Sequence, residues 1–338
     1  MQACTFKDPR EFKDCYLKQC ERRKISTPTK FLAHQTDATK LVLPADRIKV
    51  SDWEAICSAL LKENLLKTLS IVSAKKKKDW LSLVDQSVTT EFGANSVKGP
   101  AIFTRYVLEK VVTSVVKALL RKESSCESLH LELPLNPICC RLFSQGIAGA
   151  SKLRNLSLRG SCVGDEGLRF ICDALRAMPN LRELDFSECN LGVPSVERIV
   201  ELVKCHGMIL STIAWESSFR YRVPEVSSSI GLVRLSLNKN PGIGDEGARK
   251  LAEAIKDDIC LRGLDLQGCR ISNDGATALL GLLMHNKSLQ VVDVRANEVS
   301  YYVLDSIQRA LQAEERVAET KKALFKIEWL PLTTSASK

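Results

Sequence analysis

A frame of leucines returns every 28 residues or so along the second half of the chain, and this period constrains the fold more than any other feature. The pattern L-x-x-L-x-L starts at Leu153 and starts again at Leu181, Leu232, Leu261 and Leu289. The steps are 28, 51, 29 and 28 residues, so the step of 51 contains an insertion of about 23. A fixed period of this kind indicates one structural unit that is repeated and stacked along the chain.

The second half of each unit also repeats, because an apolar quintet with helical character follows each leucine frame. These quintets are Ile171–Leu175, Ile199–Val203, Leu251–Ile255, Leu279–Leu283 and Ile307–Leu311. Each unit is therefore predicted to contain a strand, a turn and a helix. Weaker versions of the frame begin at Ala38, Leu66 and Cys126, with an insertion of about 32 residues in the unit at Leu66.

The sequence predicts an α/β fold, a leucine-rich repeat solenoid of about eight repeats with two insertions. We expect a right-handed arc like that of ribonuclease inhibitor, with a parallel sheet on the concave side and helices outside. The expected organisation is an N-terminal helical cap (1–37, with a helix around Glu11 to Arg23), the repeat domain (38–312, with insertions at about 72–105 and 204–231), and the end of a C-terminal helix with a tail (313–338).

No targeting or membrane segment is visible in the sequence. Residues 1–10 have no apolar core, and no apolar run approaches the roughly 20 residues that cross a bilayer. We therefore expect a cytosolic protein without membrane insertion, monomeric as this domain.

The 13 cysteines are explained by the repeat rather than by disulfides or zinc. Cys189 and Cys269 take the turn position that Asn240 and Asn297 fill in other units, where a side chain satisfies backbone groups inside the turn. The chain contains no C-x-x-C pair, so no metal site is predicted.

Catalytic and cofactor sites are not expected either. The four histidines fall in separate units or loops, where we expect them at the surface. The repeated Gly-Asp-Glu-Gly segments, 164–167 and 244–247, resemble loops for a metal or a phosphate. Their equivalent location favours a structural role, in which Gly allows the turn and Asp165 or Asp245 caps the helix that follows.

The function is expected on the surface, and the concave face is the first candidate. Residues between the strand leucines should point to this face, since side chains alternate along a strand. One predicted column reads Ser157, Asp185, Ser236, Asp265 and Asp293, and it is flanked by the columns Asn155, Glu183, Arg234, Gly263, Val291 and Arg159, Ser187, Asn238, Gln267, Arg295. The sequence leaves open whether this face is a solvated surface or a docking face whose partner-binding residues include Asp185, Asp265 and Asp293.

The second insertion is the other candidate surface. Trp215, Phe219, Arg220, Tyr221 and Arg222 are residue types that dominate binding hot spots. In an extended segment both arginines would face one way and Tyr221 the other. The alternative is that Trp215 and Phe219 fold back and seal the edge of the solenoid.

The formal net charge is +9, part of it in the run Lys75 to Lys78. Such a run can attract anionic partners, but four lysines in a loop are more often simply solvated. Aromatic residues make up only 6% of the chain, and no stacking platform accompanies the run, so we expect no nucleic-acid binding.

Motifs in the two insertions, in two of the repeats and in the first repeat helix resemble the N-terminal repeat domain of the centrosomal protein of 78 kDa family over about residues 38 to 300. The motifs are Trp215-Glu216-Ser217, Arg220-Tyr221-Arg222-x-Pro224, Leu232-x-Arg234-Leu235-x-Leu237-Asn238, Leu261-Arg262-x-Leu264-Asp265-Leu266-Gln267-x-Cys269, Asp52-Trp53, Trp80-Leu81 and Pro100-Ala101-Ile102. The resemblance implies a non-enzymatic scaffold of the centrosome, the centriole and the ciliary basal body. It further implies a role in ciliogenesis and, through a ubiquitin ligase, in the control of centrosomal protein levels, with centrosomal proteins as partners. Family members also carry a C-terminal coiled-coil region, which this sequence does not include.

A Ran-type GTPase-activating protein is the alternative from another functional class, because such proteins are also solenoids of strand-helix repeats with this repeat length. They end in a strongly acidic tail, whereas this sequence ends with residues 332–338, Leu-Thr-Thr-Ser-Ala-Ser-Lys. The two insertions are also foreign to that pattern. We therefore expect a protein without enzymatic activity.

Overall fold

A computed structural model describes residues 11–25, 37–75, 100–218 and 231–312. Within these ranges eight parallel strands form one sheet in chain order. The strands are β1 (Lys40–Pro44), β2 (Thr68–Val72), β3 (Ser128–Glu132), β4 (Asn155–Ser157), β5 (Glu183–Asp185), β6 (Arg234–Ser236), β7 (Gly263–Asp265) and β8 (Val291–Asp293). The α-helices are α1 (Phe12–Arg22), α2 (Val50–Leu60), α4 (Arg105–Leu119), α5 (Pro137–Ile147), α6 (Gly164–Leu175), α7 (Val193–Ser218), α8 (Gly244–Ile255), α9 (Asn273–His285) and α10 (Tyr301–Gln312), and two short 3-10 helices, η2 (Ala45–Arg47) and η3 (Ala101–Phe103), precede α2 and α4.

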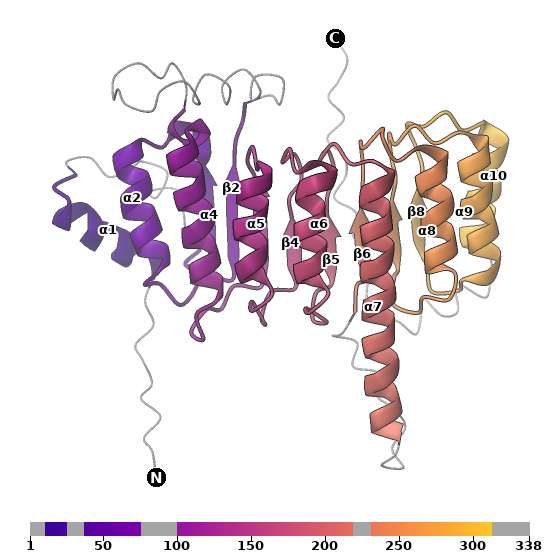
Figure 1. Cartoon of the computed structure of the whole chain (residues 1–338), viewed down its shortest axis with the longest axis horizontal. Coiled ribbons are helices and arrows are strands. Elements are labelled where there is room, and N and C mark those ends of the chain that lie inside the picture. The colour runs from indigo at the N-terminus through magenta and orange to yellow at the C-terminus, as the bar shows by residue number, and fades with distance from the viewer. Residues whose placement is uncertain (1–10, 26–36, 76–99, 219–230, 313–338) are drawn as a thin grey trace.

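The helices lie side by side on one face of the sheet, which makes the chain an arc of two layers (Figure 1). Neighbouring strands are about 4.8 Å apart, whereas packed helices need about 8 to 10 Å between their axes. The helix layer is therefore the longer one, and the sheet lies on the inside of the curve. The leucine-rich repeat arc with its eight strands is confirmed.

The leucines of the frame form one continuous core between the two layers. Leu156, Leu184, Leu235 and Leu264 pair with one another in register across successive strands, and each is at most 1% exposed. Burying one such side chain stabilises the fold by about 1.5 to 3 kcal/mol. Because each repeat contributes its share only when its neighbours are present, the stack stabilises itself repeat by repeat.

The turn positions of the repeat form the expected ladder of polar and thiol groups. The side chain of Asn240 accepts a hydrogen bond from the Cys189 amide at 3.0 Å and donates one to the Phe186 carbonyl at 2.9 Å. The Cys189 thiol donates in turn to the Leu158 carbonyl at 3.0 Å. Burial raises the pKa of the Cys269 thiol to about 12, so this equivalent cysteine is an inert part of the core.

The two Gly-Asp-Glu-Gly segments differ from the expectation in one respect. Gly164 and Gly244 have φ of +63° and +54°, as a glycine turn requires. The carboxylate of Asp245, however, does not cap its own helix α8, because it reaches the next repeat. It accepts hydrogen bonds from the Ser272 amide at 2.7 Å and the Gly275 amide at 3.0 Å, both at the start of α9.

Asp165, at the start of α6, makes the equivalent contact to the next helix, α7. It accepts hydrogen bonds from the Gly192 amide at 2.7 Å and from the Ser195 hydroxyl, at the start of α7 rather than of its own helix α6. The expected cap within the same repeat was therefore wrong. The four unpaired amides at a helix start are satisfied by whichever acceptor lies nearest in space, and here it belongs to the preceding unit.

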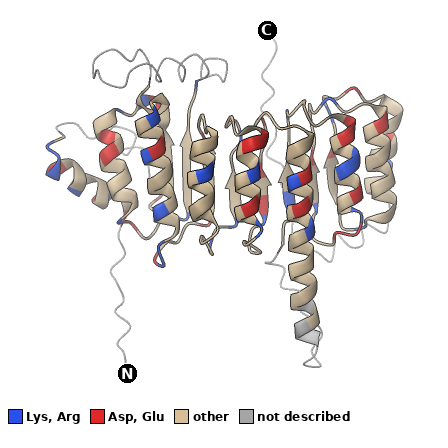
Figure 2. Cartoon of the chain, in the orientation of Figure 1, with Lys and Arg blue, Asp and Glu red and all other residues tan. Residues whose placement is uncertain are grey.

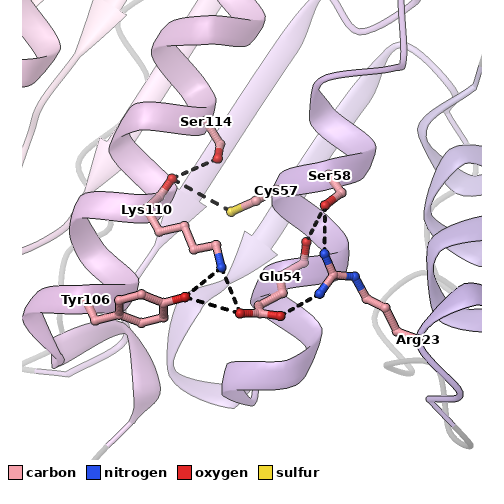
Figure 3. A network of polar contacts seen from close by, with 7 residues as sticks. All are labelled: Arg23, Glu54, Cys57, Ser58, Tyr106, Lys110 and Ser114. Carbon is pink, nitrogen blue, oxygen red and sulfur yellow. Dashed lines mark hydrogen bonds and ion pairs between the residues drawn. The ribbon is translucent and has the colours of Figure 1, made fainter.

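The helix expected around Glu11 to Arg23 is α1, which packs against α2 at the N-terminal end of the stack. Its buried face includes Phe12 and Tyr16. Figure 3 shows how its last turn is tied to the repeats: the Glu54 carboxylate of α2 accepts hydrogen bonds from Arg23 at 2.5 Å and from Lys110 of α4 at 2.7 Å. The hydrogen bond from Lys110 is the main reason why the pKa of Glu54 lies below its ordinary value.

Helix α7 is much longer than its neighbours, with 26 residues against 12 in α6 and in α8. A helix of this length spans about 39 Å, and its C-terminal half projects beyond the row of helices (Figure 1). Part of the predicted insertion 204–231 is therefore a continuation of a repeat helix. Among the helices of the described ranges, none is both long and apolar enough to cross a membrane.

Candidate partner-binding face

The concave face of the sheet holds a groove of about 670 Å³, lined by residues of β3 to β7 and by turn residues that follow the strands. All three predicted columns contribute to its lining, because every strand presents the residues on either side of its central leucine to this face. The middle column lines the groove with Ser157, Asp185, Ser236 and Asp265, and the outer columns with Asn155, Glu183, Arg234 and Arg159, Ser187, Asn238, Gln267, Arg295.

The sheet register sets the order of these groups. Ser157 pairs with Asp185, Asp185 with Ser236, Ser236 with Asp265, and Asp265 with Asp293. The acidic column predicted from the leucine frame is therefore a real row on successive strands. Asp293 continues this row on β8, next to the lining of the groove.

Two of the three acids in this row, Asp185 and Asp293, each accept hydrogen bonds from more than one group. Asp185 accepts from the Ser157 hydroxyl at 3.1 Å and from the Ser187 amide at 2.9 Å. Asp293 accepts from the Gln267 side chain at 2.8 Å and forms an ion pair with Arg295 at 2.5 Å. Both carboxylates are thus held in fixed orientations on the concave face.

Asp265 differs from these two acids. Its side chain accepts from the Gln267 amide at 3.1 Å, it is only 6% exposed, and no ion pair within the described ranges includes it. Burial is the main cause that raises its pKa to about 6, and the nearby charges of Asp293 and Asp185 raise it further. Asp265 is a carboxyl group held in a place that favours its neutral form.

Two further groups of the groove were not among the predicted partner-binding residues, although Asn238 stands in one of the predicted columns. His130 lines the groove from β3, and its burial lowers the pKa of the imidazole below the ordinary value. The Asn238 side chain is only 4% exposed, and within the part of the chain that the structure describes its Oδ1 atom has no hydrogen-bond donor. His130 could have been predicted from the sequence, because the frame at Cys126, Leu129 and Leu131 places it in the middle column.

The expectation that the histidines lie at the surface holds only in part. His285 is exposed at the end of α9, but His206 is 2% exposed, and its ring contacts the Leu175 carbonyl at 3.0 Å. His206 was misassigned because its side of α7 packs against the preceding repeat. Residue 34 lies outside the described ranges, and within those ranges no group of three or more His, Cys, Asp or Glu residues is arranged to hold a metal ion.

The second candidate surface is described only as far as residue 218. Trp215 lies on the projecting part of α7 with 65% of its surface exposed, so it is not the buried residue that sealing the solenoid would require. Between Lys204 and Glu216 the helix carries no charged residue, whereas α6 and α8 on either side of it carry charges of both signs (Figure 2). Phe219, Arg220, Tyr221, Arg222 and the lysines at 76–78 lie outside the described residues.

Comparison with known proteins supports the repeat and the resemblance alike. A family profile described as "Leucine Rich repeat" matches residues 149–172, 177–200, 232–252 and 258–280. The chain is 34% identical over 259 residues to the human "Centrosomal protein of 78 kDa", covering 75% of this chain and 36% of that protein. It is 29% identical over 307 residues to the Drosophila melanogaster "Protein Cep78 homolog", covering 89% of this chain and 37% of that protein.

A more distant similarity joins the chain to mouse "Ribonuclease inhibitor", at 30% identity over 154 residues that cover 43% of this chain and 33% of that protein. The similarity to the centrosomal proteins confirms the resemblance predicted from the two insertions. The chain spans a little over one third of the length of these centrosomal relatives.

Proposed function

We propose that this chain is a non-enzymatic protein-binding scaffold of the centrosome, the centriole and the ciliary basal body. Its role would lie in ciliogenesis and in the regulation of centrosomal protein levels, with centrosomal proteins and a ubiquitin ligase complex as partners. The similarity to proteins named as centrosomal supports the location. The observation that carries the binding role is the concave groove, in which polar side chains of successive strands stand in a fixed order.

Such a groove suits recognition of a protein segment. The strands hold their side chains at a regular spacing on a rigid sheet, so a bound segment can be matched at several positions at once. The groups that line the groove include carboxylates, amides, hydroxyls and guanidinium groups, which gives it both donors and acceptors. Charged groups held in this way contribute more to the choice of partner than to raw affinity.

We also propose two elements around this face. Residues 1–37 and 313–338 would close the ends of the repeat domain 38–312, as terminal units of solenoids require a polar cover. The segment from Trp215 to Arg222 would form a second contact for partners or for targeting. The exposure of Trp215 on the projecting part of α7 supports this second contact.

The test of the binding role is to fill the groove and follow the partners. In ciliated cells, a tagged full-length protein with Ser157→Arg should lose most partners found by proximity labelling and mass spectrometry, because the new side chain occupies the groove. Ser144→Arg on α5 is the matched control, since it adds the same side chain to the outer helix layer. An unchanged partner set for Ser157→Arg, with normal folding of both variants, would place the binding role elsewhere.

A further inference from the structure

The groove contains a carboxylate whose position is unfavourable for the fold. Asp265 lies in the row of acids between Asp185 and Asp293, it is nearly fully buried, and no cation within the described ranges pairs with it. Arg295, in the turn after the neighbouring strand β8, is already engaged, because it binds both oxygens of Asp293. A buried carboxylate without a cation is costly, and a carboxyl group with a perturbed pKa that lies in a groove is a candidate for contact with a ligand.

An independent observation points to the same missing group. Asn238 lines the same groove, is 4% exposed, and its Oδ1 atom is a buried acceptor to which no group of the described residues donates. Buried acceptors are nearly always satisfied, by protein groups or by water, and an acceptor that lies in a groove is placed where a donor of a bound partner can supply the hydrogen bond. Both side chains can therefore be satisfied by a hydrogen-bond donor from a ligand. For the Asp265 carboxylate, a donor that carries positive charge is the favoured one.

We propose that the groove binds an arginine side chain of a partner protein, which reaches Asp265 with one side of its guanidinium group and Asn238 Oδ1 with another. This inference rests on the proposed protein-binding function and names the chemistry that its concave face recognises. A guanidinium group presents five N–H donors in a fixed plane, so it can serve two acceptors at once, which a single lysine ammonium group does with less geometric definition.

The net charge of the chain distinguishes local binding in the groove from long-range electrostatic attraction of a basic segment. The formal net charge is +9, so long-range electrostatics oppose the approach of a basic segment. Binding of such a segment therefore has to come from local contacts in the groove. The concave acids provide them, because Asp185, Asp265 and Asp293 stand on adjacent or nearly adjacent strands.

The probes are two blocked nonapeptides, one with a central arginine between glycines and one with citrulline in its place. Citrulline has nearly the same shape and no charge. We expect the arginine peptide to shift amide resonances of β5 to β8 in NMR titrations and to bind at least tenfold more tightly than the citrulline peptide. Asp265→Asn should remove this preference, whereas Glu253→Gln, which removes the same charge from the outer side of α8, should leave it unchanged.

Stability measured on the same samples guards against an unfolded variant, because Asp265→Asn should melt no lower than the parent protein. Equal binding of the two peptides, or an intact arginine preference in Asp265→Asn, would overturn the inference. These outcomes are separate from the test of the proposed function. If Ser157→Arg removes the cellular partners while Asp265→Asn keeps them all, the concave face binds partners and the arginine site is wrong.

Discussion

At the scale of single residues, Asp265 is predicted to reduce stability at neutral pH. Its pKa of about 6 in the folded protein exceeds the ordinary value of 3.8, so the folded chain holds a proton that the unfolded chain has lost. The free energy of unfolding therefore falls as the pH rises from about 4 to 6, and above that it stays lower by up to about 3 kcal/mol.

Asp265→Asn should remove this loss. At pH 7 the variant should unfold at higher temperature than the parent, and the difference should shrink toward zero at pH 4. Denaturant unfolding of both proteins across this range measures the difference directly, which cancels the contributions of other acids. A variant that is less stable than the parent at pH 7 would mean that the carboxylate already has a stabilising partner.

Residue positions also show what the sequence could and could not predict. The frame placed Asp185, Asp265 and Asp293 in one column because the period of a repeat and the alternation of a strand are local properties. It could not show that Asp265 alone is buried without a cation. That difference depends on how Gln267 and Arg295 on neighbouring turns divide their hydrogen bonds, which is a matter of packing between repeats.

At the scale of elements, the start of α9 should depend on the repeat before it. Asp245→Ala removes the acceptor for the amides of Ser272 and Gly275, and the loss of a cap costs about 1 to 2 kcal/mol. Hydrogen exchange of these two amides should accelerate. Asp274→Ala is the control in the first turn of α9 itself, and it should cost less, since an exposed acid there acts mainly through the helix dipole.

Helix α7 illustrates a second limit of sequence reading. The segment after Lys204 was predicted as an insertion because the next leucine frame is late, and that prediction concerned spacing rather than conformation. The residues from Cys205 to Ser218 contain no proline and only one glycine, so they continue a helix that has already formed. The composition of this segment therefore favoured a helix, but the prediction was based on the spacing of the leucine frame and did not use it.

The projecting part of α7 leads to a prediction about Trp215. Because this side chain is mostly exposed, Trp215→Ala should change the free energy of unfolding by no more than about 0.5 kcal/mol. Arg220→Glu together with Arg222→Glu should likewise leave the melting temperature nearly unchanged while it lowers centrosomal enrichment of a tagged full-length protein. A loss of 3 to 5 kcal/mol for Trp215→Ala, about the cost of emptying a buried aromatic site, would contradict the exposed position.

At the scale of the whole molecule, the arrangement favours binding over chemistry. The concave acids and amides lie in a row along a sheet, so we expect the purified domain to leave the turnover of GTP by Ran unchanged. A GTPase assay with and without the domain checks this expectation. Stimulated turnover that disappears when Arg159 or Arg295 is replaced by Ala would support the Ran-type alternative.

The contact from Asp245 to α9 also bears on how such an array can grow. A leucine-rich unit counted from strand to strand is not self-contained, because Asp245, which accepts from two amides at the start of α9, belongs to the unit before it. Deleting one unit along the strand boundaries keeps this contact only when the preceding unit carries its own side-chain acceptor at the equivalent site, an aspartate such as Asp245 or an asparagine such as Asn273. Asp165 and Asp245 provide that match between two units of this chain. Duplication of units is therefore structurally permitted where the turn keeps such an acceptor, and a copied unit without it would remove one acceptor from the start of the next helix.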